Sequence, residues 1–135
     1  MLTKNFYLGV FYDTFGYPTD SRMTTADELM EAINTHRIKH GLYPINKKEA
    51  LCDLAKEELK NSYPLIYTKN YQMVRDFNQG KEILQVFEEP TLAKNIINRY
   101  WWRPFSQQQK TITDPNWRLG CGAVSNLQLV FIFSR

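Results

Sequence analysis

The first half of the chain alternates hydrophobic and polar positions with the period of α-helices and predicts two of them. In the first, the apolar stripe consists of Ala26, Leu29, Met30 and Ile33, with Arg37 continuing its line. Thr25 and Glu28 have the spacing of a capping box ahead of this stripe. Gly41 is typical of the left-handed residue that closes a helix. The pattern therefore predicts a helix from Ala26 to His40.

A second stripe follows after a short connection. It consists of Ala50, Leu51, Leu54, Ala55 and Leu59. Asn46 and Glu49 have the spacing of another capping box. The helix is expected to end near Asn61, because Pro64 comes soon afterwards.

The last residues of the chain alternate with a period of two, which is typical of a β-strand. Leu127, Leu129, Phe131 and Phe133 alternate with Gln128, Val130, Ile132 and Ser134. Ser125 and Asn126 form a turn back to the run from Leu119 to Val124. These segments predict an antiparallel hairpin whose apolar surface the helices must cover.

The region between the second helix and the hairpin has a weaker pattern. A third helix is expected from Pro90 to Trp102, with an apolar side made of Leu92, Ala93, Ile96, Ile97, Tyr100 and Trp101. A short helix is predicted at Tyr71–Asn78, and a polar loop that includes the string FSQQQKT is predicted after the third helix.

Residues 1–22 form an aromatic N-terminal arm ahead of a domain at residues 23–135. Its aromatic side chains are Phe6, Tyr7, Phe11, Tyr12, Phe15 and Tyr17. One interpretation is a strand or strap that packs on its own domain, and the other is an arm that contacts a partner. Both interpretations bury the aromatic rings.

Composition and charge narrow the function classes. The chain has 135 residues, enough for one domain, with 17 basic and 14 acidic residues and a net charge of +3. The basic residues are dispersed, so we expect no nucleic-acid partner. No segment is apolar over the length that a transmembrane helix needs.

The two cysteines, Cys52 and Cys121, are too few for a disulfide framework. Two buried, reduced thiols are the favoured interpretation, and a single bridge is the alternative. The N-terminal residues make a poor signal peptide, and no Asn-x-Ser/Thr site occurs. We therefore expect an intracellular protein, or a secreted one if Met1 is not the natural start.

Several short motifs resemble the CAP superfamily of cysteine-rich secretory, antigen 5 and pathogenesis-related 1 proteins. The string INTHR places Asn34 and Arg37 as N-x-x-R, and Gly41 and Pro44 follow. Later similarities are Trp102, then Asp114, Pro115 and Trp117, then Leu119, Gly120, Cys121 and Gly122. The resemblance spans about Asp27 to Phe133. It implies an α+β fold, a three-layer α-β-α sandwich of CAP type.

The chain departs from the family where many members bind a divalent cation. The positions that match the second cleft histidine are Gln107 or Gln108, depending on the motif counted from, and residues 63–70 contain no histidine. Glu82 in GKEIL matches a family glutamate, but the following Asn is missing. Because imidazole is the ligand that suits zinc in such a cleft, we expect no zinc and no cofactor.

The only histidines, His36 and His40, share a face of the first helix. Arg37 and Lys39 between them would oppose a bound metal, and no glutamate there could act as a general base. Cys121 has no visible activating base either. The residues therefore predict a protein that is not an enzyme.

A remaining cluster of Tyr100, Trp101, Trp102 and Arg103 could form a stacking surface, although packing is the favoured interpretation. If a groove replaces the family's cleft, its candidate lining residues are Glu82, Trp102, Gln107 and Gln108.

These features predict a non-enzymatic, CAP-like binding or structural domain that acts through protein–protein contacts, within a larger assembly if one exists. One alternative is a lipid- or sterol-binding CAP domain at a membrane surface. The other is a hydrolase with an unrecognised site.

Overall fold

The computed structural model describes residues 4–5, 10–12, 18–19, 22–62 and 71–135. It is an α+β fold in which four helices pack on one open, mixed sheet of five strands. The helices are α1 (Ala26–Lys39), α2 (Glu49–Asn61), α3 (Ala93–Asn95), which continues as the π-helix η2 (Ile96–Trp101), and α4 (Gln107–Ile112). The sheet contains β4 (Asn46–Lys47), β5 (Gln72–Phe77), β6 (Gly80–Val86), β7 (Leu119–Ser125) and β8 (Gln128–Ser134).

The predicted C-terminal hairpin is confirmed and lies at the centre of this sheet. The strand order is β4-β7-β8-β6-β5. Strand β8 pairs antiparallel with both β7 and β6, with Phe131 opposite Gly122 on one side and Ile83 on the other. The two-residue strand β4 pairs with β7 in parallel.

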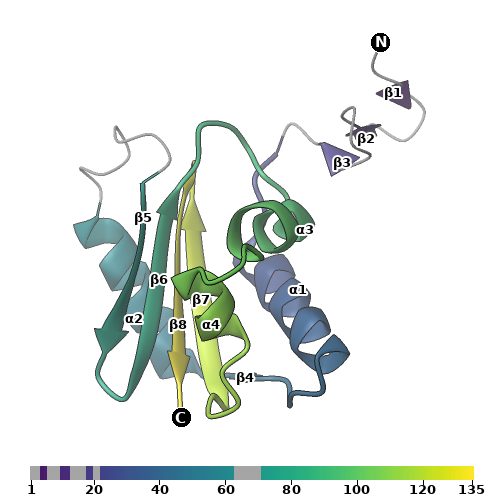
Figure 1. Cartoon of the computed structure of the whole chain (residues 1–135). Helices are drawn as coiled ribbons and strands as arrows, with labels where there is room; N and C mark the ends of the chain where they lie inside the picture. Colours follow the sequence, from purple (N-terminus) through teal and green to yellow (C-terminus); the bar gives the residue numbers. More distant parts are fainter. Residues whose placement is uncertain (1–3, 6–9, 13–17, 20–21, 63–70) are drawn as a thin grey trace.

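The two faces of the sheet carry separate apolar clusters, because alternate residues of each strand point in opposite directions. Phe131 and Phe133 of β8 belong to the cluster under α1, α3 and η2, which we call the α1 face. Val130 and Ile132 belong to the smaller cluster that Ala55 of α2 joins, which we call the α2 face. Figure 1 shows α2 on one side of the sheet and α1, α3 and α4 on the other.

Helix α1 begins where the sequence predicts and ends one residue earlier. The hydroxyl of Thr25 accepts a hydrogen bond from the Glu28 N–H at 3.1 Å, and the Glu28 carboxylate accepts one from the Thr25 N–H at 3.0 Å. At the other end, Gly41 has a φ of +76°, and the Leu42 N–H donates to the Arg37 carbonyl at 2.9 Å. Both the capping box and the left-handed cap are confirmed.

The predicted end of α2 at Asn61 is confirmed, but the second capping box is wrong. Asn46 lies in β4, opposite Leu119, and the residue that precedes the helix is Lys48, whose side chain makes no capping hydrogen bond. Pairing with the sheet edge holds Asn46 away from the helix start.

Cys52 of α2 and Cys121 of β7 form a disulfide across 69 residues of sequence. The favoured interpretation of two reduced thiols is therefore wrong. Both cysteines are buried on the α2 face, where the helix lies directly over the strand. Their pairing depends on this tertiary contact, which the spacing of two cysteines does not reveal.

The short helix predicted at Tyr71–Asn78 is also wrong, because this segment forms β5. Its partner is β6, with Val74 opposite Ile83. Met73 packs with the α2-face cluster and Val74 with the α1-face cluster. Because apolar side chains of this strand point to both faces of the sheet, the sequence does not show the regular alternation of apolar and polar residues that indicates a strand.

The third helix starts later and coils more widely than predicted. It begins at Ala93 rather than Pro90, and most of it is the π-helix η2. The predicted polar loop contains α4, because the Ser106 hydroxyl accepts a hydrogen bond from the Gln109 N–H at 3.0 Å and caps that helix. The sequence pattern did not indicate this helix, because its first three residues are glutamines and look like a polar loop.

The N-terminal arm is described only in part. Strands β1 (Lys4–Asn5), β2 (Val10–Tyr12) and β3 (Pro18–Thr19) form a short antiparallel sheet. Phe11 and Tyr12 lie in β2, whereas Phe6, Tyr7, Phe15 and Tyr17 lie outside the described residues. The choice between packing on the domain and contacting a partner stays a prediction.

Candidate binding groove

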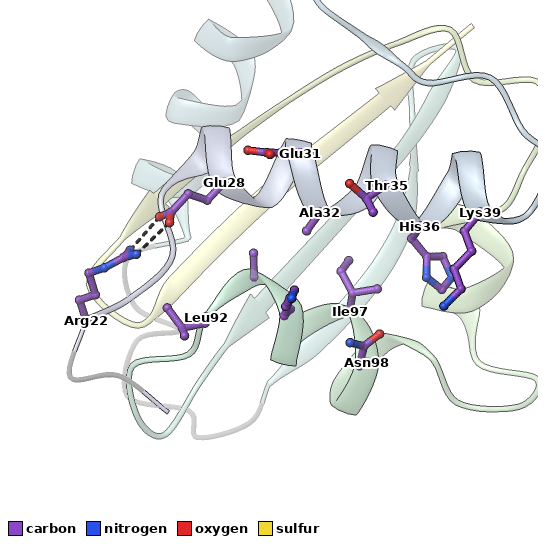
Figure 2. Close-up of a pocket in the computed structure, with 12 residues that line it drawn as sticks. Arg22, Glu28, Glu31, Ala32, Thr35, His36, Lys39, Leu92, Ile97 and Asn98 are labelled. Carbon is purple, nitrogen blue, oxygen red and sulfur yellow. Dashed lines mark hydrogen bonds and ion pairs between the residues drawn. The ribbon is translucent and has the colours of Figure 1, made fainter. Parts of the chain in front are cut away.

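A groove of about 490 Å³ runs between α1 and the segment formed by α3 and η2 (Figure 2). Its floor is made of small and apolar side chains: Ala32, Leu92, Ala93 and Ile97. Its polar rim consists of Arg22, Glu28, Glu31, Thr35, His36, Lys39, Lys94 and Asn98. We call this feature the α1–η2 groove. Its size lies within the range of pockets that hold small molecules or short segments of a partner.

One end of the groove carries an ion pair between Arg22, just ahead of α1, and Glu28 in its first turn. The two Arg22 Nη atoms donate to the two Glu28 carboxylate oxygens at 2.8 and 2.9 Å, as Figure 2 shows. The hydrogen bond from Arg22, together with the backbone bond from Thr25, lowers the pKa of Glu28 to about 2. Glu28 therefore stays ionised at physiological pH and is already neutralised by Arg22.

The opposite end of the groove carries His36 and Lys39 (Figure 2). There the Trp102 ring packs against both histidines, with centroid distances of 4.4 Å to His36 and 4.8 Å to His40. The two histidine rings lie 4.3 Å apart. We call these three residues the histidine–tryptophan cluster.

The π-helix positions two successive tryptophans for different tasks. Trp101 is buried, and its Nε1–H donates to the Gln85 side-chain oxygen at 2.6 Å. The Trp102 N–H donates to the Ile97 carbonyl at 2.9 Å, which places Trp102 just after the helix and against α1. π-Helical turns are rare and are frequent at functional sites, and this one supplies a wall of the groove.

The remaining residues of the predicted stacking surface do not gather in one place. Tyr100 meets Phe87 edge to face, with centroids 5.2 Å apart. Arg103 bonds through Nε to the Arg99 carbonyl at 3.2 Å. These contacts agree with packing, the favoured interpretation of that cluster.

The surroundings of His36 favour its neutral form. Burial lowers the pKa of His36, and the nearby charges of His40 and Lys39 lower it further. Its Nε2 atom is buried and makes no hydrogen bond within the described residues. His40 uses Nδ1 to contact the His36 carbonyl oxygen at 2.8 Å. No three described His, Cys, Asp or Glu side chains group closely enough to hold a metal ion, and the predicted lack of zinc stays a prediction.

The four residues predicted to line a groove are not brought together. Trp102 contacts His36 at the end of the α1–η2 groove. Gln107 is exposed on α4, whereas Gln108 is buried and its amide donates to the Gln72 side-chain oxygen at 2.9 Å. Glu82 lies two residues before Leu84 in β6, so both side chains point to the α2 face. The α1–η2 groove is on the opposite side of the sheet.

Glu82 is a fully buried carboxyl group with an incomplete set of partners. Its Oε1 accepts a hydrogen bond from Arg75 Nε at 3.1 Å, and Arg75 also pairs with Glu58 of α2. Its Oε2 is buried without a hydrogen-bond partner among the described residues. Burial raises the pKa of Glu82, the neighbouring Glu58 carboxylate raises it further, and Arg75 opposes both effects.

The N-x-x-R motif has a structural task next to the groove. The Asn34 side chain makes two hydrogen bonds with the backbone of Ile45, at 2.8 and 2.9 Å. The buried Arg37 guanidinium donates to the carbonyls of Tyr43, Ile112, Asp114 and Trp117 at 2.9–3.4 Å. These bonds attach the connection before β4, the end of α4 and the connection after α4 to helix α1.

Sequence reasoning missed most of the α1–η2 groove. A usable signal was present in α1, where Ala32, Thr35 and Lys39 recur at helical spacing beside the apolar stripe. Small residues at such positions leave room between two packed helices. On the opposing wall, Leu92, Ala93 and Ile97 belong to the predicted apolar side of the third helix, but the sequence does not indicate that this side leaves a groove against α1.

Comparison of the chain with protein-family models and with curated protein sequences gave no match. Among the helices that the structure describes, none combines the length and the apolar character needed to cross a bilayer.

Proposed function

We propose that this chain is a CAP-like binding domain, a three-layer α-β-α sandwich that works by protein–protein contact and not by catalysis. The α1–η2 groove is the observation that carries the proposal. It offers an apolar floor between two helices and a rim of charged and polar side chains. A segment of a partner protein that lays apolar side chains into such a groove follows a recurrent mode of peptide recognition.

The architecture supports the CAP-like part of the proposal. Helix α2 on one face and α1, α3 and α4 on the other enclose the sheet. Asn34 and Arg37, the two fixed positions of the motif, make bonds that attach the connecting segments to α1. The motif residues therefore stabilise the fold. A binding domain needs such residues as much as an enzyme does.

The environments of the named hydrolase candidates support a non-enzymatic role. Cys121 is in a disulfide, so it has no thiolate for nucleophilic attack. The Glu82 side chain is 0% exposed and bonded to Arg75, so a substrate has no direct access to it. His36 and His40 pack against Trp102.

The disulfide supports a different compartment from the expected intracellular one. Disulfides persist in oxidising environments and are rare in the cytosol. We therefore propose that the chain matures in an oxidising compartment. Analysis of free thiols in protein isolated from its source would test this. Cys52 and Cys121 that do not react with a thiol reagent before reduction support the proposal, and two reactive thiols contradict it.

Selection from a displayed library of short random peptides, with the full chain as bait, tests the binding function. The variant Thr35→Trp fills the groove from an exposed position of α1. Ile38→Trp is the matched control, because Ile38 is also exposed on α1 but does not line the groove. We expect selected peptides to lose at least ten-fold in affinity for the Thr35→Trp variant, about 1.4 kcal/mol, and to keep it for the control.

Equal binding to both variants would overturn the groove as the binding site. Failure to select any peptide, combined with flotation of the chain on lipid vesicles, would favour the lipid-binding alternative instead.

A further inference from the structure

We propose that the partner segment in the α1–η2 groove is acidic as well as apolar, with carboxylate groups that meet Lys39 and Lys94. This inference rests on the proposed function and adds the chemical class of the partner. It follows from which charged side chains around the groove already form ion pairs and which do not.

The floor of the groove sets the apolar half of the requirement. Ala32 and Ala93 contribute little more than methyl groups, so the two helices leave a hollow between them. Leu92 and Ile97 supply larger apolar surface in the same hollow, and Figure 2 shows Ile97 pointing toward the side of α1 that carries Ala32. Apolar side chains of a partner can fill this space and displace water from it.

The rim sets the charged half. Arg22 and Glu28 neutralise each other at one end of the groove. Lys39, in the last turn of α1, and Lys94, in α3, make no ion pair or side-chain hydrogen bond with any residue that the structure describes. Glu31 is the only other charged residue of the rim, so two cations face one uncompensated carboxylate.

The groups near Lys39 favour a partner group that accepts hydrogen bonds over one that donates them. Figure 2 shows His36 and Lys39 together at the end of the groove away from Arg22. Burial lowers the pKa of His36 and so favours its neutral form, whereas the Lys39 ammonium brings a positive charge to this end of the groove. Thr35 and Asn98, which also line the groove, offer a hydroxyl and an amide N–H that a carboxylate can accept from.

The arrangement suits a peptide better than a small lipid. The two lysines stand on opposite walls, one on α1 and one on α3. A peptide presents several charged side chains along its length and can meet both, whereas a single headgroup at the end of an acyl chain meets one. Electrostatic complementarity of this kind sets orientation and specificity more than total affinity.

The test uses peptides selected from the random library on the full chain. We expect them to carry Asp or Glu beside Leu, Ile, Phe or Met. Lys39→Glu and Lys94→Glu should each weaken binding about five-fold at low ionic strength and less at high salt. Lys60→Glu is the matched control, because this exposed lysine lies on α2, across the sheet, and the substitution changes the net charge equally. The thermal unfolding midpoint of each variant shows that it is folded.

The outcomes separate this inference from the proposed function. Peptides without acidic residues that still lose affinity for Thr35→Trp would overturn the inference and leave the groove in place. Equal weakening by Lys60→Glu would also overturn it, since the effect would then come from net charge alone. Peptides whose affinity is unchanged by Thr35→Trp would overturn both.

Discussion

On the α1 face of the sheet large aromatic side chains fill the core, whereas on the α2 face small side chains and a disulfide hold the helix. Trp101, Trp117, Phe131 and Phe133 are all buried on the α1 face. The α2 face instead uses Ala55, Ala123 and a few aliphatic residues, with the Cys52–Cys121 bond beside them. Since aromatic side chains bury far more surface than alanines, the two helical layers depend on different interactions.

Strand β7 serves both faces through three consecutive residues. Gly120 and Gly122 lie against the Phe131 ring on the α1 face, where a Cβ added at Gly122 would come within 2.7 Å of a ring carbon. Cys121, between them, points to the other face and reaches Cys52. The string Gly-Cys-Gly therefore combines space for an aromatic ring with a covalent link to α2.

His36 on the α1 side and Glu82 on the α2 face each lie in a setting that disfavours the charged form. On the α1 side, burial lowers the pKa of His36, and on the α2 face, burial raises the pKa of Glu82. The first group makes the fold less stable as the pH falls, and the second makes it less stable as the pH rises. The contributions of these two groups to stability therefore change with pH in opposite directions.

The largest expected effect comes from removing the disulfide. The double variant Cys52→Ala/Cys121→Ala should lose about 4 kcal/mol of unfolding free energy, because the bond closes a loop that spans 69 residues. Urea unfolding in the absence of reductant measures the loss. Adding reductant should lower the stability of the native chain and leave the variant unchanged. A loss well below 1 kcal/mol would mean that α2 is held by packing, as α1 is.

The next effect tests how the α1 side is attached to its connecting segments. Arg37→Met should cost about 3 kcal/mol, because four carbonyl groups lose a buried charged donor while the apolar volume is largely kept. Chemical unfolding measures the loss. Met30→Ala, at a partly buried position of the same helix, serves as a packing control with a smaller expected cost. An equal cost for the two would show that the hydrogen bonds contribute little.

Gly122→Ala tests the aromatic packing directly. The added methyl group must displace the Phe131 ring, which should cost about 2 kcal/mol. In the double variant with Phe131→Leu, the smaller side chain leaves room for the methyl group, so the cost of Gly122→Ala should fall by at least half. Additive costs in this double-mutant cycle would contradict the contact.

Glu82→Gln tests the titratable group of the α2 face. Because the folded-state pKa is raised, the native chain binds more protons than the unfolded chain above pH 4.5, and its stability falls as the pH rises from there. The Gln side chain does not titrate. The Tm of the variant should therefore exceed that of the unmutated protein by about 3 °C at pH 8 and by less at pH 4. A lower Tm for the variant at both pH values would show that the ionised pair with Arg75 is favourable.

The smallest effect concerns the histidine–tryptophan cluster. The folded-state pKa of His36 is lowered, so the unfolded chain binds more protons below pH 6.5, and the stability contribution of neutral His36 is lost as the pH falls. His36→Gln should reduce the drop in Tm between pH 7 and pH 5 by about 1 °C, a small change because the ring is partly exposed. An unchanged pH dependence would mean that protonated His36 is accommodated without loss of packing.

The elements that sequence analysis predicted well are those whose signals are local. The capping box of Thr25 and Glu28 and the alternation in β8 involve residues within a few positions of one another. The strand β5 was missed because apolar neighbours on both sides conceal its period, and α4 because its polar residues resemble a loop. Of the predicted groove residues, Trp102 alone contacts a residue that lines the α1–η2 groove.

By itself, the sequence determined α1, α2 and the C-terminal hairpin, because capping, periodicity and turn preferences act over a few residues. Only the tertiary structure decided that Cys52 and Cys121 form a disulfide, on which side of the sheet Glu82 lies, and that a groove lies between α1 and η2. Those features join segments that are distant in the chain, and their energies come from burial and contact after the elements have packed.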